Sequence, residues 1–238
     1  MLYGGIDGCK YGWILMKSDQ RNIQFGGIFQ SVKDLLEANQ DLDRILIDMP
    51  IGLSSKGYLR TVDALLRKEL QGRHSTVFNV PARASLAAKT HKEASQINQI
   101  IEGKKISIQS FFISKKIAEL DNLLINRPTL KNKFIESHPE LCFKYLNKGT
   151  TVLSKKSTKE GIQERLAILK KYDPRIDNLY REVEGQTKKK FVKRDDIIDA
   201  ICLCLANQLS GKSKMQFILD PLIEDAVGIR MRVAYFTI

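Results

Sequence analysis

The stretch Leu2-Tyr-Gly-Gly-Ile-Asp-Gly8, followed closely by Gly12-Trp-Ile-Leu-Met-Lys17, decides the fold class of this chain. Both segments are short and apolar, and only a glycine-containing turn separates them, so they predict two paired strands. Alternating apolar residues between Asn22 and Phe29 predict a third strand. Short connections between successive strands are typical of an antiparallel meander.

A helix and a fourth strand follow the meander. The segment Ser31-Val-Lys-Asp34 has the pattern of a helix N-cap, and Leu35 and Leu36 continue it with an apolar face. The segment Ile45-Leu-Ile47 is uniformly apolar, which is typical of a central, parallel strand. The order strand, strand, strand, helix, strand predicts an α/β protein with a mixed sheet.

The remainder of the chain is predicted to be mainly helical. Residues 52–130 interrupt the α/β pattern, and we interpret them as a helical insertion into a single domain that spans residues 1–238. Lys133–Glu136 predicts a fifth strand, and alternation from Val227 to Tyr235 predicts a late one. Helices are expected at 59–70, 92–102, 110–124, 157–172 (opened by a capping box from Ser157 to Glu160), 175–184 and 195–209.

Composition limits the class of protein and of partner. With 43% apolar and 28% charged residues, the 238-residue chain resembles an ordinary soluble globular protein. Its 39 basic and 27 acidic residues leave a net charge of +12, which favours a polyanionic partner such as nucleic acid; a merely lysine-rich surface is the alternative. The four cysteines lack zinc-site spacing, and no targeting or membrane segment is evident, so we expect a cytoplasmic protein with reduced thiols and no membrane partner. The sequence does not determine the oligomeric state, and a homodimer is one of the alternatives.

Carboxylates stand where predicted strands end and on one helical face. Asp7, Asp48 and Glu136 end the first, fourth and fifth strands, and Asp196 and Asp199 share a face of the helix at 195–209. Two carboxylates about 4–5 Å apart repel by about 3–4 kcal/mol at an effective dielectric constant near 20. A sheet that gathers these groups would therefore need divalent cations, and we predict two Mg²⁺ or Mn²⁺ ions. The alternative is that each of these residues only caps its own helix or marks the end of its own strand.

Other polar residues are candidates for proton transfer and for substrate binding. His138, in the segment Glu136-Ser-His-Pro-Glu140, is a candidate for catalytic proton transfer, and a structural histidine is the alternative. Basic residues cluster before the acidic helix, and a polar segment follows Gly72. The candidate substrate-binding residues are Lys10, Arg73, His74, Ser75, Arg83, Lys190, Lys193 and Arg194.

Five motifs in order resemble one family. They are Gly5-Ile-Asp-Gly-Cys-Lys-Tyr-Gly-Trp13, Ile47-Asp-Met-Pro-Ile-Gly-Leu53, Gly72-Arg-His-Ser-Thr-Val-Phe78, Glu136-Ser-His-Pro-Glu140 and Asp195-Asp-Ile-Ile-Asp-Ala200. The chain thereby resembles domain-of-unknown-function family 429, a family of predicted nucleases with the ribonuclease H-like fold. The resemblance implies a five-stranded mixed sheet of order 3-2-1-4-5 with helices on both faces.

The resemblance also implies roles for individual carboxylates. Asp7 resembles the first-strand aspartate of the ribonuclease H-like superfamily, and Asp48 its fourth-strand carboxylate. Asp196 and Asp199 look like the Asp-x-x-Asp-Ala helix of Holliday-junction resolvases, and Glu136 belongs to the family's own Glu-x-His-Pro-Glu motif. We therefore expect Asp7, Asp48, Glu136, Asp196 and Asp199 to be both metal ligands and catalytic residues.

The expected function is a metal-dependent nuclease that hydrolyses phosphodiester bonds in DNA or RNA. One alternative is a non-catalytic module that binds nucleic acid or protein on a nuclease fold. Another is a phosphotransferase, because the turn from Asp7 to Gly12 also resembles the phosphate loop of sugar kinases and actin-like ATPases. Those enzymes need two such domains, and 238 residues are too few for two.

Overall fold

A computed structural model describes residues 1–19, 21–211 and 215–237, and the chain divides into two units. The first unit comprises Met1–Asp48, Asn132–Gln216 and Ala234–Ile238, and the second comprises Met49–Lys131 and Phe217–Val233. The second unit thus contains the whole stretch that we predicted as a helical insertion, residues 52–130, together with residues 217–233 of the C-terminal region.

A five-stranded sheet of order β3-β2-β1-β4-β5 forms the centre of the first unit. Its strands are β1 (Tyr3–Gly8), β2 (Trp13–Ser18), β3 (Ile23–Phe29), β4 (Arg44–Ile47) and β5 (Phe134–Glu136). The pairs β1–β2 and β2–β3 are antiparallel, whereas β1–β4 and β4–β5 are parallel. The predicted meander, the parallel fourth strand and the strand order are confirmed.

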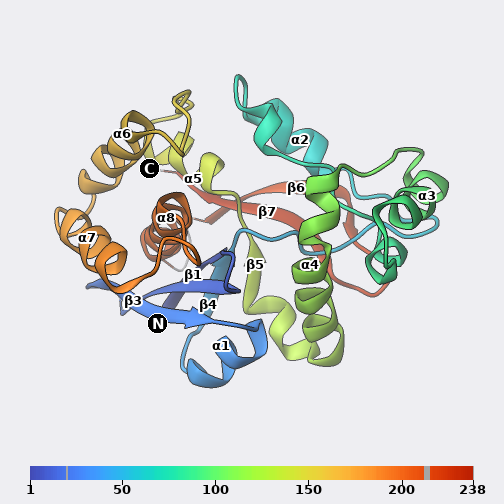
Figure 1. Ribbon diagram of the computed structural model, residues 1–238, viewed down its shortest axis with the longest axis horizontal. Coiled ribbons are helices and arrows are strands. Elements are labelled where there is room, and N and C mark those ends of the chain that lie inside the picture. The colour runs from blue at the N-terminus through green and yellow to red at the C-terminus, as the bar shows by residue number, and fades with distance from the viewer. Residues whose placement is uncertain (20, 212–214, 238) are drawn as a thin grey trace. The chain divides into compact units, whose positions relative to one another are not determined.

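Helices cover both faces of this sheet (Figure 1). Helix α8 (Arg194–Ser210) packs on β1, β2 and β4, and α1 (Val32–Ala38) lies on the opposite face. Around α8 pack α5 (Pro139–Leu146), α6 (Lys159–Lys170) and α7 (Ile176–Gln186). Because α8 lies between the sheet and these helices, it is buried from Ile197 to Asn207, and its residues from Ile197 to Ala206 are apolar apart from Asp199.

Helix α8 lies unusually close to β1. A Cβ atom at Gly5 would lie 2.2 Å from the backbone nitrogen of Cys204 and 2.5 Å from the carbonyl oxygen of Ala200, so only glycine permits this approach. The Asn207 side chain then donates to the carbonyl oxygens of Gly4 (2.8 Å) and Arg44 (3.0 Å). These contacts hold α8, and the acidic residues at its N-terminal end, in a definite position on the sheet.

Two helix starts test the capping predictions. Ser31 is the N-cap of α1, and its Oγ accepts a hydrogen bond from the Asp34 nitrogen, as predicted. The prediction for Ser157 was wrong, because α6 begins one residue later and Thr158 Oγ1 caps it by accepting from the Gly161 nitrogen. Neighbouring Ser and Thr residues are both good N-caps, so the local pattern does not separate them.

The second unit is built from helices and a two-stranded ribbon. Its elements include α2 (Val62–Glu69), α3 (His91–Glu102), α4 (Ile108–Asn126), the 3₁₀ turns η1 (His74–Thr76) and η2 (Arg83–Ala87), and most of η3 (Pro128–Asn132). The unit also contains residues 217–233 of the ribbon formed by β6 (Met215–Glu224) and β7 (Arg230–Phe236). The late strand that we predicted corresponds to β7, whereas the sequence prediction did not include β6. Buried polar contacts organise this unit: Asp220 accepts from the backbone nitrogens of Thr61 and Val62 at the start of α2.

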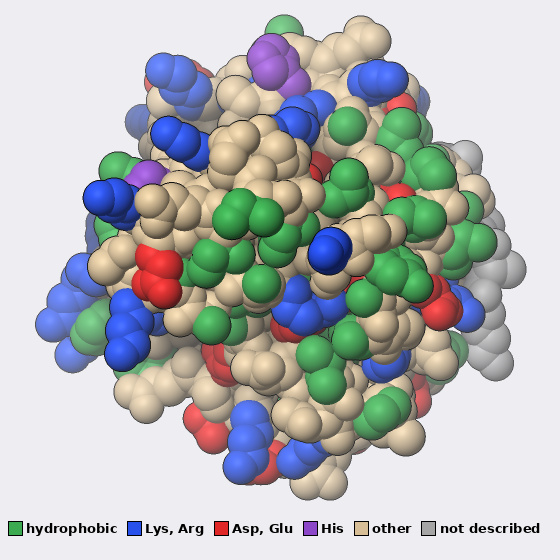
Figure 2. Space-filling view, turned by 90° about the vertical axis from the view of Figure 1, so that its right-hand side faces the viewer, with side chains coloured by type: hydrophobic (Ala, Val, Ile, Leu, Met, Phe, Trp, Pro, Cys, Tyr) green, Lys and Arg blue, Asp and Glu red, His purple; other side chains and the backbone are tan. Residues whose placement is uncertain are grey.

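The surface of the second unit is mixed in character. On the face of the molecule that Figure 2 shows, apolar side chains lie among basic ones. Large exposed apolar residues of this unit include Tyr58, Leu59, Ile100, Ile108 and Phe112. Within the described ranges, no helix is both long enough and apolar enough to cross a membrane.

Candidate active site

Asp7 and Asp48 lie side by side on adjacent parallel strands. Ile6 of β1 pairs with Ile47 of β4, and the Asp48 nitrogen continues the ladder by donating to the Ile6 carbonyl oxygen (3.0 Å). Side chains alternate along a strand, so the next pair, Asp7 and Asp48, shares one face of the sheet. It is the face of α8, because Gly5, two residues before Asp7, contacts that helix. Asp7 is buried and Asp48 is half-buried.

Helix α8 brings Asp199 to the same place. Asp199 is fully buried, and no hydrogen-bond partner to its Oδ1 atom is found in the described part of the chain. Asp196 is half-buried, and its Oδ2 accepts from the Lys193 nitrogen (2.8 Å) at the start of the same helix. Asp196 therefore caps its helix in part, whereas capping does not account for Asp199.

The ionisation of these carboxylates shows that they act on one another. Burial, followed by the charges of Asp48 and Asp199, raises the pKa of Asp7 well above its usual range. Burial raises the pKa of Asp199 to about 6 against the attraction of Lys156, and Asp48 adds repulsion. The pKa of Asp48 also rises to about 6 by burial. Asp7, Asp48 and Asp199 thus form one electrostatically coupled group, which we call the carboxylate cluster.

A lysine that the sequence analysis did not assign to the site reaches the carboxylate cluster. Lys156 Nζ lies 2.6 Å from Asp199 Oδ2 and 4.0 Å from Asp195 Oδ2. Its pKa is raised, first by Asp199 and then, against the effect of burial, by Asp7 and Asp48. Only its place in a run of basic residues marked Lys156 in the sequence, and such runs usually face solvent.

The pairing of β5 with β4 places Glu136 away from the carboxylate cluster, and His138 follows it at the start of α5. Ile47 pairs with Glu136, so alternation places Glu136 on the face opposite Asp7 and Asp48, and Ser137 continues on their face. His138 is the half-buried N-cap residue of α5. The register thus does not favour Glu136 as a ligand beside Asp7.

Glu140 is the glutamate whose charge acts on the cluster. Its charge helps to raise the pKa values of Asp48 and Asp199. Both of its carboxylate oxygens accept from Arg165 Nη2, at 2.7 and 2.9 Å, and both residues are buried. A buried, paired carboxylate of this kind positions its neighbours.

The cluster suits a divalent cation in its donor chemistry. Carboxylate oxygens are the ligands that Mg²⁺ and Mn²⁺ prefer, and the buried, unpartnered Oδ1 of Asp199 is such an oxygen. Over residues 1–19, 21–211 and 215–237, no three His, Cys, Asp or Glu side chains stand at the mutual spacing of a metal site. Lys156 Nζ instead contacts Asp199. The two-ion site therefore stays a prediction.

Exposed basic residues lie beside the start of α8. Lys188–Lys190, Lys193 and Arg194 are exposed, and we call Lys188–Arg194 the basic loop. The Tyr11 nitrogen donates to the Phe191 carbonyl oxygen (3.2 Å), and the two rings meet edge to face, with centroids 5.5 Å apart. The turn that carries exposed Lys10 therefore lies against the basic loop. Arg194 also pairs with Glu184.

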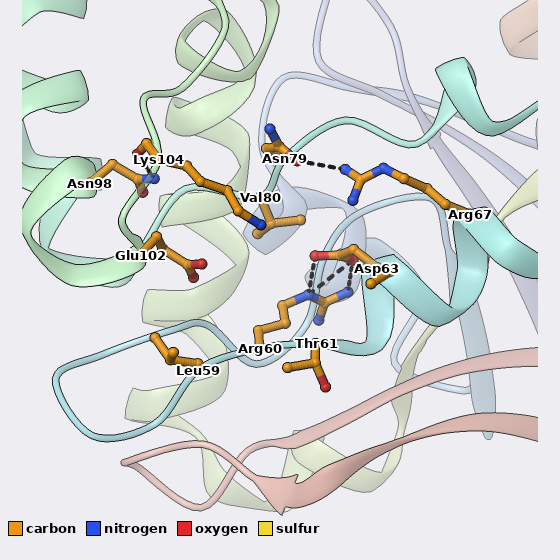
Figure 3. Close-up of a pocket in the computed structure, with 11 residues that line it drawn as sticks. Leu59, Arg60, Thr61, Asp63, Arg67, Asn79, Val80, Asn98, Glu102 and Lys104 are labelled. Carbon is orange, nitrogen blue, oxygen red and sulfur yellow. Dashed lines mark hydrogen bonds and ion pairs between the residues drawn. The ribbon is translucent and has the colours of Figure 1, made fainter.

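The remaining predicted substrate-binding residues belong to the second unit. His74 and Ser75 are exposed in η1, and Arg73 is half-buried before it. Arg83 pairs with both Asp121 and Asp225, which is a structural role within this unit. A separate pocket of the same unit contains Arg60, Asp63, Arg67 and Lys104 (Figure 3). There Arg60 binds Asp63 and two backbone carbonyl oxygens, so its charge is already satisfied.

The mixed sheet of order 3-2-1-4-5 with helices on both faces is the predicted ribonuclease H-like fold. The family model described as Protein of unknown function (DUF429) matches residues 5–221, and the chain belongs to this family. No curated protein and no solved structure matches the chain.

Proposed function

We propose that the protein is a metal-dependent phosphodiesterase that cleaves nucleic acid. The observation that carries the proposal is the convergence of buried Asp7, half-buried Asp48 and buried Asp199, from two strands and one helix, into one acidic group. Burying carboxylates that repel one another costs free energy of folding, so the arrangement is more readily explained by a function than by stability.

In this proposal, some residues of the chain bind the cation and others hold the binding residues in position. Asp7, Asp48 and Asp199 would hold Mg²⁺ or Mn²⁺, and the bound cation would stabilise negative charge on the phosphoryl group. The contacts of Arg165 Nη2 with both carboxylate oxygens of Glu140 keep α6 and α5 in place next to the cluster. Asp199 Oδ1 keeps its lone pairs available because no described group donates to it.

The basic loop supports nucleic acid as the substrate class. Its exposed lysines precede α8 directly, and Lys193 is itself the N-cap residue of that helix. A phosphate backbone bound along the loop would lead towards Asp196 and Asp199, mostly without sequence readout. The net charge of +12 also favours binding of a polyanion such as nucleic acid.

A cleavage assay tests the proposal. The full chain is incubated with labelled single- and double-stranded DNA and RNA, with Mn²⁺, with Mg²⁺ or with a chelator. We expect cleavage that depends on metal and that Asp7→Asn and Asp199→Asn abolish, while Asp41→Asn, an exposed aspartate outside the cluster, leaves it unchanged. Equal activity of Asp199→Asn and the wild type, or no cleavage of any substrate with either metal, would refute the proposal.

One observation favours the non-catalytic binding module as a second candidate. The ammonium group of Lys156 already neutralises part of the negative charge of the carboxylate cluster, as a bound metal ion would. A module of this kind would bind nucleic acid through the basic loop, and that binding would be indifferent to metal and to Asp199→Asn.

A further inference from the structure

We propose that Lys156 is a resident cation of the carboxylate cluster, and that the site therefore takes one divalent ion beside it in place of a pair. The inference deepens the proposed function, on which it rests. It concerns the number of ions, which neither the strand order nor the acidic motifs determine.

The contact is specific in its geometry. Lys156 comes from the loop between α5 and α6, and its Nζ approaches Asp199 Oδ2 to 2.6 Å. The distance from Nζ to Asp195 Oδ2 is 4.0 Å, so the ammonium group is directed mainly at the more buried of the two aspartates. The Lys156 side chain is 37% exposed, compared with 1% for that of Asp199. Lys156 thus covers a buried charge from the solvent side.

The loop that carries Lys156 is held from several directions. Arg165 Nη1 donates to the carbonyl oxygen and to the Oγ of Ser154, at 3.2 and 3.3 Å. The Lys155 carbonyl oxygen accepts from the nitrogen and the Oγ1 of Thr158. A Cβ atom at Gly161 would lie 1.9 Å from this same oxygen, so the loop packs directly on the backbone of α6. Lys156 is therefore placed by structure, unlike a freely moving surface lysine.

The loop and the cluster also share one buried partner. Arg165, which binds Ser154, makes its two short contacts to Glu140, the glutamate whose charge acts on Asp48 and Asp199. A single buried ion pair thus positions the lysine loop and borders the cluster. This connection is expected if Lys156 belongs to the site.

Charge balance leads to one ion. Ionised Asp7, Asp48 and Asp199 carry three negative charges, and Lys156 with one divalent cation carries three positive ones. A pair of divalent cations with Lys156 would carry five positive charges, two more than the three negative charges of the carboxylate cluster. Excess like charge in a poorly solvated site is unfavourable. The unpartnered Asp199 Oδ1 leaves an oxygen for that one ion while Oδ2 stays with Lys156.

The test counts bound ions without measuring activity. Mn²⁺ binding to the full chain is titrated by electron paramagnetic resonance of free Mn²⁺, and spin coupling between bound ions reports a close pair. We expect one uncoupled Mn²⁺ in the wild type, in Lys156→Arg and in the control Lys155→Met, whose lysine is exposed beside the site. Lys156→Met should gain a second Mn²⁺, or at least bind it tenfold more tightly, and should show the coupling.

The outcomes separate this inference from the proposed function. A coupled pair in the wild type, or a single ion of unchanged affinity in Lys156→Met, would overturn the role of Lys156 and leave a metal-dependent site standing. No Mn²⁺ bound by wild type or variant would overturn both. Circular dichroism checks that Lys156→Met is folded. Lys156→Arg shows how many Mn²⁺ ions bind when the side chain is changed but the positive charge is retained.

Discussion

Asp48→Asn should stabilise the metal-free protein at neutral and alkaline pH. Burial, opposed by Lys156 and aided by Glu140, raises the pKa of Asp48 from 3.8 to about 6. A shift of about 2 units corresponds to about 3 kcal/mol at 1.36 kcal/mol per unit, which the folded state loses when the carboxyl group ionises. Asparagine has nearly the same shape and no charge, so the variant avoids most of this loss.

The sign of the effect sets its pH dependence. A carboxyl group with a raised folded-state pKa contributes stability that is fully present below the unfolded pKa of 3.8 and is lost as pH rises through about 6. The wild type and Asp48→Asn should therefore unfold with similar free energies at pH 4. At pH 8 the variant should be more stable by up to about 3 kcal/mol, since coupling within the cluster reduces the full value.

Urea unfolding at pH 4, 6 and 8 in the presence of a chelator measures the difference. Asp41→Asn provides the matched control, because it removes the same charge from an exposed position. A variant less stable than the wild type at pH 8, or a difference that does not change with pH, would refute the view that crowded, buried carboxylates destabilise the folded chain.

Three further predictions concern the ion, the basic loop and the helix contact. Mn²⁺ at a hundredfold excess over its dissociation constant should raise the free energy of unfolding of the wild type by about 2.7 kcal/mol, and that of Asp199→Asn by less. Equal shifts of the calorimetric Tm in the two proteins would contradict a metal site at Asp199. Replacing Lys188–Lys190 with alanine should weaken binding to every DNA sequence alike, and should reduce the slope of log K against log salt concentration by about 0.9 per lost phosphate contact. Fluorescence anisotropy measures both effects, and an unchanged slope would show that the basic loop does not bind phosphates. Gly5→Ala should lower the free energy of unfolding by about 1–3 kcal/mol or more, because the new Cβ atom would lie 2.2 Å from the Cys204 nitrogen. Gly185→Ala in α7, where a Cβ atom meets open space, should not lower the free energy of unfolding in the same urea assay.

Much of the fold could be predicted because its signals are local. The segment from Leu2 to Ile47 contains short apolar strands separated by turns and one capped helix, and their succession predicted an α/β protein with a mixed sheet. The strand order 3-2-1-4-5 was predicted from the family resemblance. β6 was not predicted, because Asp220 and Pro221 interrupt its pattern and most of its side chains are exposed. Its contribution is long-range: Asp220 binds the backbone at Thr61 and Val62, far away in sequence.

The sequence by itself determined which carboxylates end β1 and β4 and which lie on one face of α8, because strand alternation and helical periodicity act over a few residues. The tertiary structure alone decided that Glu136 faces away from Asp7 and Asp48, since that depends on the register of β5 against β4. It also decided that Lys156 meets Asp199, a residue 43 positions away. Electrostatic pairing depends on distance in space, and the folded sheet and helices set that distance.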